Sequence, residues 1–174
     1  MKFSSKTIEK VVKMVRWHMF FSDTEQITLS SVRRLLQNVG QEYIWDLMNL
    51  RICDRVGTGR PKENPYRLRK YQAMIEEVMR DPISVGMLKI DGKKVMETGN
   101  IASGPRVGDI LNALLEDVLE DPGLNNEEYL NKRTIELVKM SDKEVEQLAE
   151  KGKENKDEKE GEKIKEIRKK HFVS

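Results

Sequence analysis

The chain has 174 residues, enough for one compact domain or two small ones with a limited core. No apolar run approaches the ~20 residues that a membrane helix requires, and the first residues lack the apolar segment of a signal peptide, so we expect a cytoplasmic protein with no membrane anchor. Charged residues make up 36% of the chain, with 32 basic and 30 acidic residues. Because the net charge is small, only a local cluster of basic residues could indicate a nucleic-acid partner.

Helical periodicity begins near the N-terminus. Between residues 6 and 21 the apolar positions recur three and four residues apart, which predicts a first helix; they are Ile8, Val11, Val12, Val15 and Met19. His18 falls one turn beyond Val15 and is expected to face inward as a hydrogen-bonded core residue.

Two further helices are expected before residue 58. Thr28 or Ser30 would cap the first of them, and Gly40 would end it. The second, over residues 41–55, is apolar on most sides and should be a central packing element. Asp54 lies on that apolar surface and would need a partner there, for which His18 is a candidate.

A basic segment follows these helices. Residues 57–64 form a glycine-containing loop with Arg60 and Lys62, and Asn64 and Pro65 then start a fourth helix. Its first two turns carry three more cations, an unfavourable charge at the positive end of a helix dipole; they are Arg67, Arg69 and Lys70. These five residues are the first choice for RNA phosphate contacts, and the alternative is a solvated surface balanced by Glu63, Glu76 and Glu77.

The middle of the chain joins a glycine-punctuated loop to a strongly amphipathic helix. Gly104 and Pro105 suit the start of that helix, and Pro122 and Gly123 suit its end. A helix N-terminus attracts anions, so Gly104, Pro105 and Arg106 are a candidate phosphate site, with an ordinary capped helix as the alternative.

Two capping boxes follow, Asn125 with Glu128 and Ser141 with Glu144, each at the start of a short helix. Residues 151–170 have mixed charge and few apolar side chains. They are expected to be disordered or to form a frayed single helix, because they offer little surface to bury.

Three of these motifs together resemble the helical body of bacterial tRNA nucleotidyltransferases, the CCA-adding enzymes, and of the related poly(A) polymerases. They are the glycine-containing segment 88–99, the helix start 104–111, and Leu119-Glu120-Asp121-Pro122. The chain departs from the family pattern at Lys93-Lys94-Val95, where the family usually has an acid and a leucine after the glycine.

The resemblance implies an all-α, multi-helical array like the C-terminal domain of these enzymes. Residues 1–58 would be the second half of an HD-like domain, 59–122 the RNA-binding body, 123–150 a small helical tail and 151–174 a charged extension. Asp54 matches the last aspartate of the HD metal site, but the preceding ligands have no match, so no metal site is expected.

The resemblance also implies a binding role. The catalytic head of these enzymes lies N-terminal to the matched region, so this chain is expected to hold tRNA, by the acceptor arm, or another structured RNA. It would have no catalytic residues of its own. Mg²⁺ and the substrates CTP and ATP would belong to the head, since the sequence shows no strand with paired carboxylates and no phosphate-binding loop.

Two alternatives remain at this point. The chain could be an interaction subunit that docks on a separate nucleotidyltransferase head through exposed apolar surface. It could also be a remnant HD phosphohydrolase that uses His18 and Asp54.

Overall fold

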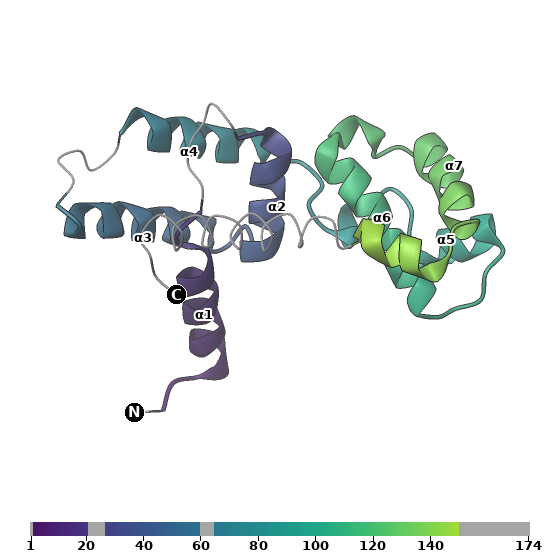
Figure 1. The fold of residues 1–174 in the computed structure, drawn as a ribbon, viewed down its shortest axis with the longest axis horizontal. Coiled ribbons are helices and arrows are strands. Elements are labelled where there is room, and N and C mark those ends of the chain that lie inside the picture. The colour runs from purple at the N-terminus through teal and green to yellow at the C-terminus, as the bar shows by residue number, and fades with distance from the viewer. Residues whose placement is uncertain (1, 21–26, 60–64, 150–174) are drawn as a thin grey trace, which may run out of the picture. The chain divides into compact units, whose positions relative to one another are not determined.

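The computed structural model describes residues 2–20, 27–59 and 65–149. Throughout these residues the regular elements are helices, and no strand occurs among them (Figure 1). The predicted all-α, multi-helical array is therefore confirmed. The helices pack as two compact units, residues 1–83 and 84–174. Within the described ranges, no helix is long and apolar enough to cross a bilayer.

The first unit contains α1 (Ser5–Trp17), α2 (Leu29–Val39), α3 (Ile44–Gly57) and α4 (Tyr66–Val78). Of the two predicted caps for α2, Thr28 is the one used: its hydroxyl accepts from the Ser31 amide at 3.3 Å. Gly40 ends α2 with φ = 94°, a conformation that glycine adopts without strain. The core lies between α2, α3 and α4; its most buried members are Val32, Leu36, Val39, Ile44, Leu47, Ile75 and Val78.

Two polar contacts fix the segment after α4 against α2 and the residue that follows its C-cap. Arg33 on α2 is 7% exposed, and its Nε donates to Asp81 Oδ2 at 2.6 Å. Gln41 donates to the carbonyl of Met79 at 2.7 Å. The Arg33 charge is thus buried with a hydrogen-bonded partner, as a buried ion requires.

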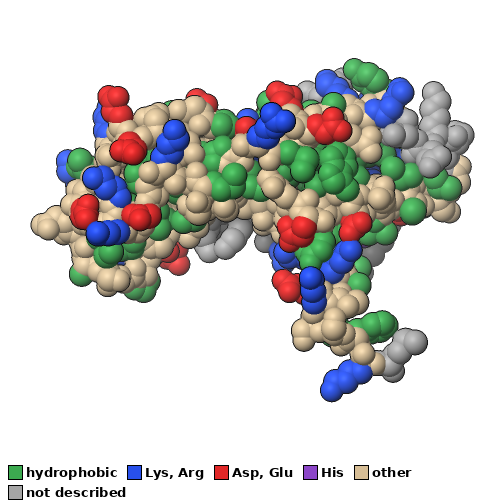
Figure 2. All heavy atoms as spheres, turned by 180° about the vertical axis from the view of Figure 1, so that it is seen from behind, with side chains coloured by type: hydrophobic (Ala, Val, Ile, Leu, Met, Phe, Trp, Pro, Cys, Tyr) green, Lys and Arg blue, Asp and Glu red, His purple; other side chains and the backbone are tan. Residues whose placement is uncertain are grey.

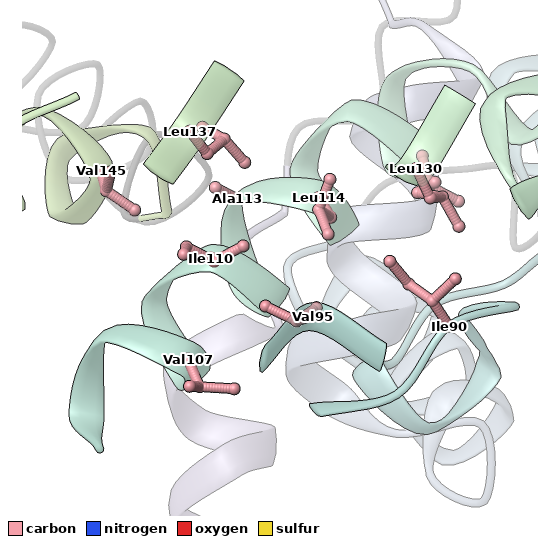
Figure 3. Close-up of a cluster of buried hydrophobic side chains, with 10 residues drawn as sticks. Ile90, Val95, Val107, Ile110, Ala113, Leu114, Leu130, Leu137 and Val145 are labelled. Carbon is pink, nitrogen blue, oxygen red and sulfur yellow. The ribbon is translucent and has the colours of Figure 1, made fainter. Parts of the chain in front are cut away.

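The second unit contains α5 (Gly92–Gly99), α6 (Pro105–Glu120) and α7 (Glu127–Val138), with short 3₁₀ turns at Val85–Met87 and Pro122–Leu124. Residues 142–149 are also helical. Its core joins α5, α6, α7 and this last segment; Figure 3 shows Ile90, Val95, Val107, Ile110, Leu114, Leu130, Leu137 and Val145 converging.

The prediction of a loop before α6 was wrong, because α5 forms there. Asp91 supplies its N-cap by accepting from the Lys94 amide at 2.8 Å, and Asn100 ends it in the left-handed conformation with φ = 49°. Both ends of this eight-residue helix are glycines, which hid its periodicity in the sequence.

The two predicted capping boxes had different outcomes. Ser141 and Glu144 form theirs: the Glu144 carboxylate accepts from the Ser141 amide at 2.8 Å. These bonds lower the pKa of the exposed Glu144 carboxyl. The cap of α7 is shifted by one position, because Asn126 caps it through the Tyr129 amide while Asn125 binds the Lys89 amide and the Met87 carbonyl.

The division of the chain after residue 83 reflects which helices contact one another. The predicted boundaries at residues 58, 122 and 150 separate parts with different expected functions. In terms of packing, α4 contacts α2 and lies in the same unit as α2 and α3. The predicted functional boundaries stay predictions. The segment 151–174, for which disorder was expected, lies outside the described residues.

Candidate nucleic-acid interface

The start of α4 places three cations on the surface. Leu68, Tyr71, Ile75 and Val78 bury one side of this helix. Their spacing leaves Arg67, Arg69 and Lys70 exposed, as helical periodicity requires. Lys and Arg side chains gather at the upper right of Figure 2, where α4 begins. The structure thus brings these three predicted residues together within one turn of helix.

The charge pattern of α4 runs against its dipole. Its first turn contains no acidic residue, and Pro65 before it makes no side-chain cap, so the positive end of the helix faces three cations. The exposed Glu76 and Glu77 lie near the negative end. From Arg67 to Glu76 the helix rises about 14 Å, beyond a Debye length at physiological salt. Glu76 and Glu77 therefore compensate the cluster weakly, and an anion at the start of α4 would stabilise it.

An exposed aromatic ring completes this cluster. Tyr66 is the first residue of α4 and is 67% exposed. It lies one turn before Lys70, so both side chains share a face of the helix. Sequence reasoning missed Tyr66. The available signal was its spacing, because Tyr66 lies two residues before the buried Leu68 and so on the opposite side of the helix. Tyr66, Arg67, Arg69 and Lys70 are called the α4 cluster below.

Arg60 and Lys62, predicted to extend this surface, and Glu63, one of the three acids that would balance it in the alternative, lie outside the described residues. Arg67 and Lys70 also take part in interactions within the chain. The α4 cluster is therefore defined by exposure and position on the helix, and not by a lack of partners.

The second predicted site, at the start of α6, has a different geometry. Gly104 is the N-cap and is exposed, with φ = 173°, an extended conformation open to any residue. Pro105 occupies the first helical position as predicted. The Arg106 guanidinium turns to the end of α7, where Nη2 donates to the carbonyls of Val138 and Met140, each at 2.8 Å.

Asp142 adds an ion pair to the same guanidinium. A cation at the C-terminal carbonyls of a helix is electrostatically favourable, so these contacts give Arg106 a structural role without any ligand. Nε of Arg106 is buried and has no hydrogen-bond partner. A role for Gly104, Pro105 and Arg106 in phosphate binding stays a prediction.

The structure does not form the expected pair between His18 and Asp54. His18 Nδ1 lies 2.7 Å from the Val15 carbonyl, and Asp54 accepts from Arg51 Nη1 at 3.1 Å. The Asp54 side chain is 35% exposed, so the expectation that it is buried was wrong. Arg51 is three residues before Asp54 on α3 and neutralises it locally. Across the described ranges, no group of three or more His, Cys, Asp or Glu side chains could hold a metal ion.

Comparison with known proteins gives one match. Over 117 residues, 67% of this chain, the sequence is 33% identical to the CC-adding tRNA nucleotidyltransferase of Thermus thermophilus. No family model matches the chain. No solved structure matches it either. The aligned residues cover 25% of the Thermus protein, so the chain spans about a quarter of that relative's length. The sequence is thus distantly similar to part of a tRNA nucleotidyltransferase.

Proposed function

We propose that this chain is an RNA-binding part of a tRNA nucleotidyltransferase-related protein. It holds tRNA or a similarly structured RNA by its phosphates, at the acceptor arm, while a catalytic head outside the chain adds nucleotides to the 3′ end. The observation that carries the proposal is the α4 cluster, in which exposed cations stand at the positive end of a helix.

Similarity and charge support the proposal independently. The relative is named for adding nucleotides to tRNA, and the similarity is compatible with tRNA as a partner. The α4 cluster offers guanidinium and ammonium groups for the phosphates of a folded RNA. Its exposed ring offers a surface for stacking on an unpaired base. Arg60 and Lys62 extend the proposed surface along the chain.

A binding titration tests this proposal. Fluorescently labelled tRNA and an unstructured RNA of equal length are titrated with the full chain at two salt concentrations. We expect tighter binding of the tRNA, weakening as salt rises because phosphate contacts release counterions. Equal affinity for both RNAs would contradict shape recognition, and no binding to either would overturn the proposal.

The same titration with an RNA duplex that lacks the tRNA elbow locates the contact. Binding of that duplex with an affinity near that of tRNA would support contact at the acceptor arm. A large loss of affinity would contradict that location while retaining tRNA as the ligand.

A further inference from the structure

The helix α1 exposes the side that an amphipathic helix normally buries. Its apolar stripe, Ile8, Val11, Val12 and Val15, recurs at helical spacing and continues to Met19 in the turn after the helix, yet these side chains are between 52% and 63% exposed. In Figure 1, α1 extends away from α2, α3 and α4, with its C-terminal part closest to them. The stripe is therefore accessible along the length of the helix.

Polar contacts attach α1 to its own unit. Lys10 Nζ lies 2.6 Å from Asp46 Oδ2, and this hydrogen bond raises the pKa of Lys10. Lys10 and Lys13 also lie over the Tyr43 ring, at 5.4 and 5.8 Å from its centroid. Only Met14 is buried among the residues of α1. The side of α1 that contacts its unit thus carries Met14 together with the two lysines, and the apolar stripe on the opposite side faces outward.

The spacing of the stripe is that of a coiled-coil seam. Ile8, Val12 and Val15 on α1, and Met19 two residues beyond its end, are separated by four, three and four residues, the spacing of heptad positions d, a, d and a. Val11 widens the seam on one side. A single large apolar stripe with this spacing is typical of a surface that another helix covers.

The charges beside the seam are complementary to those of a second, antiparallel copy of the same helix. Glu9 and Arg16 are both exposed, lie seven residues apart and fall at the same heptad position, e. In an antiparallel pair of helices, position e of one helix faces position e of the other. Two copies of α1 would therefore place Glu9 of each copy opposite Arg16 of the other, twice, while a parallel pair would form neither contact.

We propose that α1 pairs antiparallel with α1 of a second copy of this chain. The seam buries Val12 and Val15 at its centre, with Ile8 facing Met19 of the other copy toward each end, and two Glu9–Arg16 pairs set the orientation. Met19 also contacts Arg51 Nη1 through its sulfur at 3.3 Å, so the end of the seam is anchored to α3. A contact of one short helix per copy is small, so the dimer is weak and depends on protein concentration.

Sedimentation equilibrium of the full chain over a wide concentration range tests the pairing. The wild type should pass from monomer to dimer as concentration rises. Val12→Glu places a charge at the centre of the seam and should weaken the dimer by at least about tenfold, because a carboxylate is costly to bury. Val56→Glu is the matched control: Val56 is 52% exposed on α3, outside the seam, and the substitution should leave the dimer unchanged.

Charge exchange tests the orientation. Glu9→Arg alone, or Arg16→Glu alone, turns both attractive contacts into repulsive ones and should weaken the dimer several-fold. The double variant with both substitutions should restore it. A chain that stays monomeric at every concentration, or a dimer that Val12→Glu leaves intact, would overturn the proposal. A double variant that dimerises as weakly as the single variants would overturn it as well. If the chain is always monomeric, a separate catalytic chain becomes the expected occupant of this face.

Discussion

The Nη2 atom of Arg106, at the start of α6, donates to the main-chain carbonyl of Met140, just beyond α7, at 2.8 Å. The same guanidinium also donates to the Val138 carbonyl and forms an ion pair with the Asp142 carboxylate. One side chain thus connects the N-terminus of one helix to the C-terminus of another and to the segment that follows it. This relationship separates the structural role of Arg106 from its predicted role in RNA binding.

Replacing Arg106 by alanine should lower the free energy of unfolding of the second unit by about 2–3 kcal/mol, because hydrogen bonds from a charged group to two half-buried carbonyls are lost. Hydrogen exchange should become faster in residues 138–149 before it does elsewhere. Lys93→Ala, at an exposed cation on α5, serves as the control and should change neither quantity. Lower RNA affinity with unchanged stability would instead assign Arg106 to phosphate binding.

Replacing Gly99 by alanine should destabilise the same unit by about 1–3 kcal/mol. A Cβ atom at this position would lie 2.7 Å from Cγ2 of Val138, so α5 and α7 would have to move apart. Urea unfolding measures the loss, and Val138→Ala in the same chain should recover part of it. Gly86→Ala is the control, since a Cβ there meets nothing within 4 Å. Equal effects of Gly99→Ala and Gly86→Ala would contradict the close approach of the two helices.

Burial should make the first unit sensitive to alkaline pH through Tyr71. This side chain is 3% exposed, packs against Phe20 with ring centroids 4.8 Å apart, and has its pKa raised by burial. Unfolding lets the phenol ionise near its ordinary pKa of about 10, so above that pH the unfolded state binds fewer protons and stability falls by up to about 1.4 kcal/mol per pH unit.

Urea unfolding at about pH 8 and about pH 10.5, followed by the fluorescence of Trp17 and Trp45, measures this dependence. Tyr71→Phe should make the loss of stability between the two pH values smaller. If Tyr71→Phe had the same pH dependence as the wild type, the alkaline sensitivity would have another source.

Much of the fold followed from the sequence because local signals and packing agree. The start of α6 at Pro105, the end of α2 at Gly40 and the Ser141–Glu144 capping box each depend on residues within one turn, which periodicity and capping rules describe. The helix α5 escaped prediction because it is short and bounded by glycines, so its stability comes from Val95 packing in the core of its unit.

Contacts between distant residues could not be derived in the same way. Whether Asp54 is buried depends on how other helices pack against α3, and in the structure its side chain stays 35% exposed and pairs with Arg51, three residues before it. Likewise, nothing local to Arg106 indicated that its guanidinium would reach α7. The exposed positions of Arg67, Arg69 and Lys70 could be derived, because they follow from the buried face of one helix alone.

The central claim is that the α4 cluster holds RNA phosphates, and the salt dependence of tRNA affinity tests it most directly. The triple variant Arg67→Ala, Arg69→Ala and Lys70→Ala is compared with the wild type and with Lys89→Ala, Lys132→Ala and Lys143→Ala. The control variant loses the same three charges from exposed positions in the other unit. Urea unfolding should show both variants folded, since all six side chains are exposed.

For the α4 variant we expect weaker tRNA binding and a slope of log affinity against log salt that is smaller by about 2–3, one counterion being released for nearly every phosphate contact. The control variant should keep the slope of the wild type. An unchanged slope in the α4 variant, or an equal change in both variants, would contradict the account.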